Sequence, residues 1–186
     1  MYPFERFSTD AKQVLALAQE EAERARHGHI GTEHLLVALL RHNTGVAGRV
    51  LHALGADAEG IRKKVIVAPS ESGIRQIVPT PRVRKVIEIS FEEARRMGSS
   101  SVSTEHVLLA LLIEGKGIAA QALNAMGISL ERVRAEIEAA ATTTERRLPA
   151  LAADAVRLVE RARELAAADG TSETGVEHFR RALEES

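Results

Sequence analysis

The chain has no cysteine, no tryptophan and no long hydrophobic run. The lack of cysteine excludes disulfides, thiol catalysis and thiolate metal sites. Aromatic residues make up only 3% of the chain, which leaves little with which to stack nucleobases or line a large aromatic pocket. A membrane-spanning helix needs about 18 or more consecutive apolar residues, and no stretch approaches that length.

An excess of charge of one sign is also missing, because 25 basic residues nearly balance 26 acidic ones. Nucleic-acid-binding proteins normally carry a basic excess, so we expect no nucleic-acid partner. The N-terminus lacks the basic and then apolar segments of a signal peptide. Together these features predict a cytoplasmic protein that has no membrane partner.

What the sequence does have is a high content of helix-forming residues. It is 45% hydrophobic over 186 positions, which is enough to build a core. Ala, Leu, Glu and Arg dominate the composition, and all four favour helices. We therefore predict an all-α fold.

An internal repeat organises the chain. When the sequence is moved along itself so that residue 32 falls on residue 104, the Thr-Glu-His at 32–34 aligns with the same three residues at 104–106, and Gly45 aligns with Gly117. We call this the repeat shift. Applied a second time, it finds a weaker copy, Glu-His at 177–178, in a unit of which this sequence holds about half. Related repeats bury their apolar faces against one another, so we expect the two full repeats to share a core about a pseudo-two-fold axis.

Helix signals divide each full repeat into four helices. Thr32 and Thr104 stand where the second helix of each repeat needs an N-cap, and Thr80 followed by Pro81 opens repeat two. Pro149 is expected to open a further helix. The predicted organisation is a double repeat over 1–141 (repeat one 4–67, loop 68–79, repeat two 80–141), a linker over 142–148 and a C-terminal helical half-repeat over 149–186.

The repeated Thr-Glu helix start is the one motif that could carry chemistry. A capped helix N-terminus presents backbone N–H groups that attract phosphate. The adjacent glutamates, Glu33 and Glu105, suit a planar guanidinium. A ligand that joins both groups is phosphoarginine. The alternative is that Thr32, Thr104 and these glutamates only stabilise their helices, and the residues alone leave this open.

Other chemistry finds no support in the sequence. His34 and His106 have no second ligand at the spacing of a helical zinc motif, and we expect them to fill helix positions rather than bind metal. There is no P-loop, no nucleophile paired with a base and no pair of catalytic acids. We therefore predict a protein that is not an enzyme, with no metal and no cofactor.

These residues resemble the N-terminal repeat domain of Clp unfoldases, and most of all the ClpC type. The resemblance is carried by Phe-Glu-Arg-Phe at 4–7, Ile-Gly-Thr-Glu-His at 30–34, Thr-Pro-Arg at 80–82, Thr-Glu-His at 104–106 and Gly-Ile-Ala-Ala at 117–120. It implies a double four-helix repeat that receives adaptor proteins and substrates for an ATP-driven unfolding ring. By this resemblance Thr32 and Thr104 lie at the phosphate of phosphoarginine, while Glu33 and Glu105 hold its guanidinium.

The sequence departs from the family pattern in three places. Ser103 replaces the glycine before the second Thr-Glu pair, which puts the second site in doubt. Val176 replaces the threonine in the third unit, so no third site is expected. The ATPase modules are absent from this sequence, and the extra helix pair favours a free-standing relative over an excised domain.

Three functional hypotheses follow. The favoured one is a module that recognises arginine-phosphorylated substrates or adaptors of the Clp system. The second is an accessory subunit that docks on a Clp protease or unfoldase through apolar helix faces, with a homodimer through the C-terminal helices as a further option. The third is a decoy that sequesters a small molecule near Phe4 and Phe7.

Overall fold

The computed structural model describes residues 4–65, 77–171 and 173–184. Most of the loop expected at 68–79 therefore lies outside the described residues. Clustering of contacts divides the chain into two compact units, Met1–Glu138 and Ala139–Ser186.

Repeat one contains the four expected helices. Ser8 caps the first of them, because its hydroxyl accepts a hydrogen bond from the backbone N–H of Ala11. Gly55, at φ 82°, ends the third helix in the left-handed conformation that favours glycine. The elements are η1 (Phe4–Arg6), α1 (Thr9–Arg24), β1 (His29–Ile30), α2 (Thr32–Arg41), α3 (Val46–Ala53) and α4 (Ala58–Val65).

Repeat two follows the same plan at the expected spacing. Thr80 caps its first helix, with Pro81 at the first helical position as predicted. The elements are β2 (Val78–Pro79), α5 (Pro81–Arg96), α6 (Thr104–Glu114), α7 (Ile118–Ala125) and α8 (Leu130–Ala168). The starts of these four helices all align with the starts of α1 to α4 under the repeat shift, which confirms the repeat read from the sequence.

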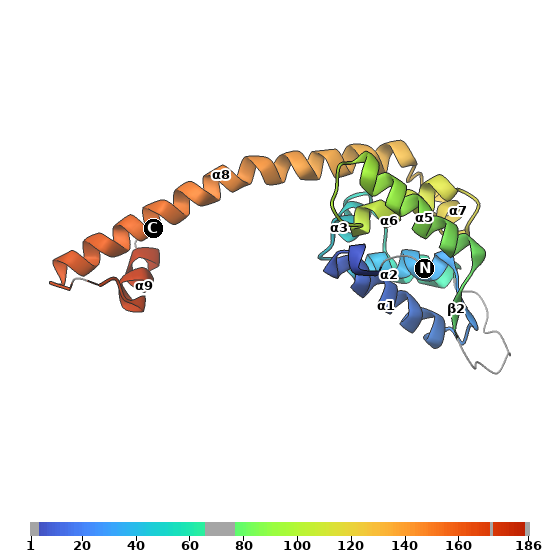
Figure 1. Cartoon of the computed structure of the whole chain (residues 1–186), viewed down its shortest axis with the longest axis horizontal. Helices are drawn as coiled ribbons and strands as arrows, with labels where there is room; N and C mark the ends of the chain where they lie inside the picture. Colours follow the sequence, from blue (N-terminus) through green and yellow to red (C-terminus); the bar gives the residue numbers. More distant parts are fainter. Residues whose placement is uncertain (1–3, 66–76, 172, 185–186) are drawn as a thin grey trace. The chain divides into compact units, whose positions relative to one another are not determined.

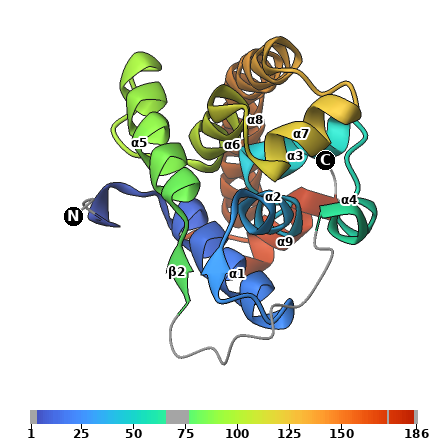
Figure 2. The same ribbon diagram turned by 90° about the vertical axis from the view of Figure 1, so that its right-hand side faces the viewer.

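The two repeats share one core. Helix α2 lies in the middle of the first unit and contacts α1, α3, α4, α6 and α7 (Figure 1, Figure 2). Its residues Thr32–Leu40 are all buried, and one apolar cluster contains residues from both repeats. This arrangement explains why α2 and α6 are apolar nearly all round rather than on a single stripe.

Two short backbone pairings, which the sequence did not predict, cross between the repeats. Strands β1 and β2 are parallel, with Ile30 opposite Pro79. An isolated parallel bridge joins Phe7 to Val102, the residues that align with Pro79 and Ile30 under the repeat shift. The two pairings therefore occupy equivalent positions in the two repeats, as pseudo-two-fold symmetry requires.

Each repeat also contains a buried ion pair, at equivalent positions of the two repeats. Glu21, which is fully buried, lies 3.1 Å from the Arg62 guanidinium and joins α1 to α4. Glu93, its counterpart under the repeat shift, lies 2.9 Å from Arg134 and joins α5 to the start of α8. Buried charges need such partners, so these pairs hold the fourth helix of each repeat in place.

Helix α8 differs from the prediction at its middle. The linker expected over 142–148 is helical, and Pro149 lies inside α8 rather than at the start of a further helix. A proline inside a helix removes one backbone hydrogen bond, but Ala, Glu and Arg residues flank this stretch and favour helix on both sides.

The second unit contains the end of α8 and helix α9 (Val176–Glu184). Ala162 and Leu165 of α8 pack against Ala182 of α9 in a small apolar cluster. Gly170, at φ 72°, lies in the turn between the two helices. This unit is the helix pair that the sequence predicted as half of a third repeat.

No single helix among the described residues is long and apolar enough to cross a membrane, although α6 and α7 reach those limits together as a pair bent by 89°.

Candidate functional site

The Thr-Glu motif of repeat one lies at the junction between β1 and α2. The backbone N–H of Thr80 donates to the Ile30 carbonyl at 3.0 Å, which brings the start of α5 beside the start of α2. Gly31 is the extended N-cap of α2, and Thr32 is its first helical residue. Thr32 and Glu33 are both buried, at 3% and 6% exposed.

The two motif threonines do not cap their own helices, which corrects the sequence-based prediction. Thr32 Oγ1 accepts a hydrogen bond from the backbone N–H of Ala119 at 3.4 Å, and Thr104 Oγ1 accepts one from Ala47 at 3.2 Å. These amides lie in the first turns of α7 and α3, and each of those helices begins after a glycine that has no capping side chain. Each threonine thus caps a helix of the other repeat.

Close packing around the threonines requires those glycines. A Cβ at Gly117 would lie 2.5 Å from Thr32 Oγ1, and a Cβ at Gly45 would lie 3.0 Å from Thr104 Oγ1. The glycines that align under the repeat shift are therefore part of the contact between the repeats.

A pocket of about 550 Å³ opens at the start of α2. Its lining comes from both repeats, with Glu33 from α2, Arg82 from α5 and Lys116 from the turn between α6 and α7. The Arg82 guanidinium also pairs with Glu114 at 2.8 Å. The pocket therefore combines one buried carboxylate, two cations and a helix N-terminus. Sequence reasoning found Glu33 but missed both cations, because they are distant in the chain.

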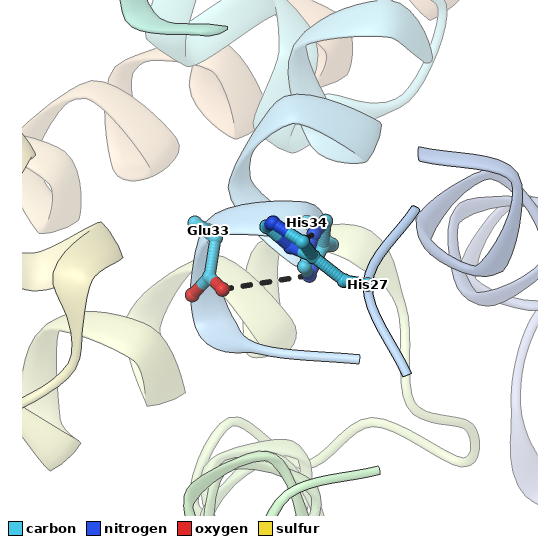
Figure 3. A group of neighbouring side chains, drawn as sticks. All are labelled: His27, Glu33 and His34. Carbon is cyan, nitrogen blue, oxygen red and sulfur yellow. Dashed lines mark hydrogen bonds and ion pairs between the residues drawn. The ribbon is translucent and has the colours of Figure 1, made fainter. Parts of the chain in front are cut away.

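The Glu33 carboxylate has no cation beside it among the described residues. Its ion-pair contact there is with the ring of His34, whose Nδ1 lies 3.6 Å from Oε1. Figure 3 shows this carboxylate turned toward the imidazole. A buried, uncompensated carboxylate is costly, and a cationic ligand group would relieve that cost.

His34 is neutral and acts as a helix cap. The backbone N–H of Gly31 donates to its Nδ1 at 2.9 Å, so the ring proton lies on Nε2, which is 2.9 Å from Nδ1 of His27. Burial, together with the nearby His27 and His29, lowers the pKa of His34 to about 4. Because the imidazole is uncharged at neutral pH, it does not neutralise Glu33.

His27, Glu33 and His34 bring candidate metal-ligand atoms within 4.8 Å of one another. However, both nitrogens of His34 are already engaged, one by the Gly31 amide and the other by His27. The hydrogen bonds of the His34 ring are therefore satisfied without an ion, and we interpret the cluster as a cap. His27 is half-buried against His34.

The same histidine cap occurs in both full repeats and in the C-terminal half-repeat. The N–H of Ser103 donates to Nδ1 of His106, and the N–H of Gly175 donates to Nδ1 of His178, each at 2.9 Å. A histidine at the third helical position thus replaces the Glu or Gln of a capping box. Its recurrence at the third position after the N-cap was the signal in the sequence that could have revealed this role.

The motif of repeat two is built differently from that of repeat one. Glu105 is half-buried, and its carboxylate accepts a hydrogen bond from the Thr104 hydroxyl at 3.4 Å. His106 Nε2 is buried without a hydrogen-bond partner among the described residues. Burial lowers the pKa of His106, while the carboxylates of Glu105 and Glu93 oppose that shift.

The two phenylalanines considered as a contact site lie in different environments. Phe7 is 4% exposed and packs edge-on against Phe91, with ring centroids 5.2 Å apart. Phe4 is 56% exposed. Phe7 is therefore a core residue, and Phe4 is the accessible member of the pair.

Comparison with protein families gives two overlapping matches to the model described as the Clp repeat (R) N-terminal domain, over residues 6–116 and 78–185. The starts of the two matches, at 6 and 78, align under the repeat shift. The second match includes the C-terminal helix pair, which supports its origin as part of a third repeat.

Curated relatives include the negative regulator of genetic competence ClpC/MecB of Bacillus subtilis, which is 48% identical over 136 residues. The chaperone protein ClpB of Oceanobacillus iheyensis is 44% identical over 136 residues. Each alignment covers 72% of this chain and 17% of the relative. The chain thus spans a small part of the length of these relatives.

Solved structures agree on the fold. The N-terminal domain of the chaperone ClpD from Arabidopsis thaliana superposes with a TM-score of 0.58 at 22% identity, covering 74% of this chain and 98% of that one. The Hsp104 N-terminal domain from Candida albicans gives a TM-score of 0.61 at 17% identity, covering 70% of this chain and 88% of that one.

Proposed function

The chain belongs to the Clp repeat (R) N-terminal domain family, and from this premise we propose that it is a non-catalytic recognition module of Clp protein quality control. It binds arginine-phosphorylated proteins, or adaptors that carry the same group, and brings them to a Clp unfoldase or protease. The ligand group is phosphoarginine, which enters the pocket at the start of α2.

The observation that carries this proposal is the buried carboxylate of Glu33, which lines the pocket and forms no ion pair with Arg82 or Lys116. A guanidinium supplies the missing charge and can donate two parallel hydrogen bonds to a carboxylate. A lysine ammonium would supply the charge but not the planar pair of donors.

The phosphoryl end of the ligand has its own partners in this pocket. The first backbone N–H groups of α2 have no acceptor within their own helix, and Lys116 and Arg82 line the same pocket. Because Thr32 is buried between the repeats, with its hydroxyl against the first turn of α7, we assign the phosphate to backbone N–H groups and these cations rather than to the hydroxyl.

The test is calorimetric titration of free phosphoarginine into the full chain, repeated with Glu33→Gln. Glutamine keeps the size of the side chain but cannot balance a guanidinium, so we expect binding to the wild type and loss of it in the variant. Glu177→Gln is the matched control, because it changes the corresponding position of the third unit, which is exposed. The absence of binding to the wild type, by heat and by thermal shift, would refute the proposal.

The second candidate function is a docking subunit, and the second unit supplies the observation for it. Leu183 is 60% exposed and lines a pocket of about 710 Å³ together with Ala155 and Leu158. Docking through this surface predicts that Leu183→Glu abolishes a complex with a purified Clp unfoldase, whereas Glu33→Gln and Glu105→Gln leave the complex intact. The opposite pattern would favour recognition of phosphoarginine.

A further inference from the structure

The rim of the pocket carries an ion pair whose cation is replaced by a carboxylate at the equivalent position of the other repeat. In repeat one's site, Arg82 Nη1 lies 2.8 Å from Glu114 Oε1. At the positions that align with this pair under the repeat shift, Asp10 Oδ1 lies 3.1 Å from His42 Nε2, close but not aligned as a hydrogen bond. The cation at the edge of one site is therefore replaced by a carboxylate at the edge of its counterpart.

The second cation of the pocket is also absent from the counterpart. Lys116, which lines the pocket at Glu33, corresponds to Thr44 under the repeat shift. The first site therefore combines Glu33 with two cations, whereas the equivalent positions of the second site hold Glu105, Asp10 and an uncharged threonine. A phosphoryl group is dianionic or nearly so at neutral pH, and two carboxylates at those positions repel it.

The carboxylates of Glu33 and Glu105 cannot occupy equivalent positions in their repeats. The Glu33 carboxylate folds over Gly31, where a Cβ would lie 2.2 Å from Glu33 Oε1. Ser103 carries a Cβ at the equivalent position in repeat two, so Glu105 must lie elsewhere. It accepts a hydrogen bond from Thr104 and is more exposed than Glu33, and it thereby loses the buried, uncompensated state that favours a guanidinium.

We propose that the two repeat-related sites have diverged, so that the chain binds one phosphoguanidinium group, at Glu33, and the copy at Glu105 binds none. Arg82 and Lys116 are the residues that determine specificity for the phosphoryl group, and Gly31 leaves room for the carboxylate. This inference rests on the proposed function, because it assigns the stoichiometry and the selectivity of the same pocket.

The first experiment measures the number of sites. Free phosphoarginine is titrated into the wild type, Glu33→Gln and Glu105→Gln, and each variant is checked for an unchanged melting temperature. We expect one site in the wild type, none in Glu33→Gln and one unchanged site in Glu105→Gln. Two sites in the wild type, or a loss of binding in Glu105→Gln, would overturn the divergence while leaving the proposed function in place. No binding to any of the three proteins would overturn both.

The second experiment tests the role of Lys116. Lys116→Ala removes an exposed side chain while keeping the backbone N–H that donates to Glu114, so its fold is preserved. We expect phosphoarginine to bind about tenfold more weakly, while Thr44→Ala at the equivalent position changes nothing. Equal affinity in Lys116→Ala and the wild type would remove Lys116 from the phosphoryl site.

A gain of function completes the test. The triple variant Asp10→Arg, Thr44→Lys, Ser103→Gly gives the second site the charges and the space of the first. We expect a second binding event in this variant, which Glu105→Gln then abolishes. If the folded triple variant keeps a single site, these three positions do not account for the difference between the repeats.

Discussion

Replacement of Thr104 by valine would test the contact that joins the two repeats at their sites. Valine keeps the branched shape and the volume of threonine but removes the oxygen that accepts the Ala47 N–H at 3.2 Å. Ala47 is fully buried, so water cannot replace the lost acceptor. An unsatisfied buried amide costs about 1–3 kcal/mol, and because no cavity is made, we expect Thr104→Val to lower the free energy of unfolding by about that amount.

The helix that loses stability distinguishes a Thr104 hydroxyl that caps α3 from one that caps its own helix, α6, as the sequence predicted. Amide hydrogen exchange should show that Ala47, in α3 of repeat one, loses protection, while the first turn of α6 keeps it. Thr80→Val is the matched control, because the Thr80 hydroxyl caps its own helix through Val83 at 3.3 Å. In that variant the lost protection should lie in α5 itself. A loss of protection at the start of α6 in Thr104→Val, with Ala47 unchanged, would refute the cross-repeat cap.

Three further outcomes are expected. The folded pKa of His34, about 4, lies below its usual 6.5, so the unfolded chain binds more protons between these values and stability falls as pH drops through them. The total loss is on the order of 3 kcal/mol, and urea unfolding across this window should show a flatter profile for His34→Gln. Equal profiles would contradict the assignment. Glu21→Gln leaves its arginines without a buried carboxylate and should cost about 3 kcal/mol. Arg24→Ala, which removes a side chain that is 52% exposed, should cost under about 1 kcal/mol, and equal melting temperatures for the two variants would count against the buried network. Gly31→Ser places a Cβ against the flexible Glu33 carboxylate. It should weaken phosphoarginine binding in calorimetry with little change in melting temperature. Unchanged affinity would show that binding does not require the Glu33 carboxylate to lie over Gly31.

The sequence predicted those features of the fold whose causes are local. The helix-forming composition and the Thr80–Pro81 helix start act over short stretches of chain, and α5 begins where Pro81 predicts. The internal repeat also predicted the shared core, because it showed that each apolar face has a related face to pack against. The family matches confirm the spacing of that repeat.

The features that the sequence did not predict depend on contacts between distant segments. Thr32 has the residue type of a local cap, and only the packing of α7 beside it shows that its hydroxyl serves another helix. Nothing in the sequence marks Lys116 and Arg82, and both line the pocket at Glu33 only because the two repeats fold together. The helical course of 142–148 was missed because threonine is only a few tenths of a kcal/mol less favourable in a helix than its neighbours.

The C-terminal helix pair carries charged residues at positions where the first repeat is apolar. Helix α9 corresponds to α2 when the repeat shift is applied twice, and α2 is buried all round by its own repeat and the other one. The α2 residues Leu36, Val37 and Leu40 correspond to Arg180, Arg181 and Glu184. Charged residues therefore stand where α2 is apolar and buried. This substitution favours contact with solvent over an apolar dimer interface on that face.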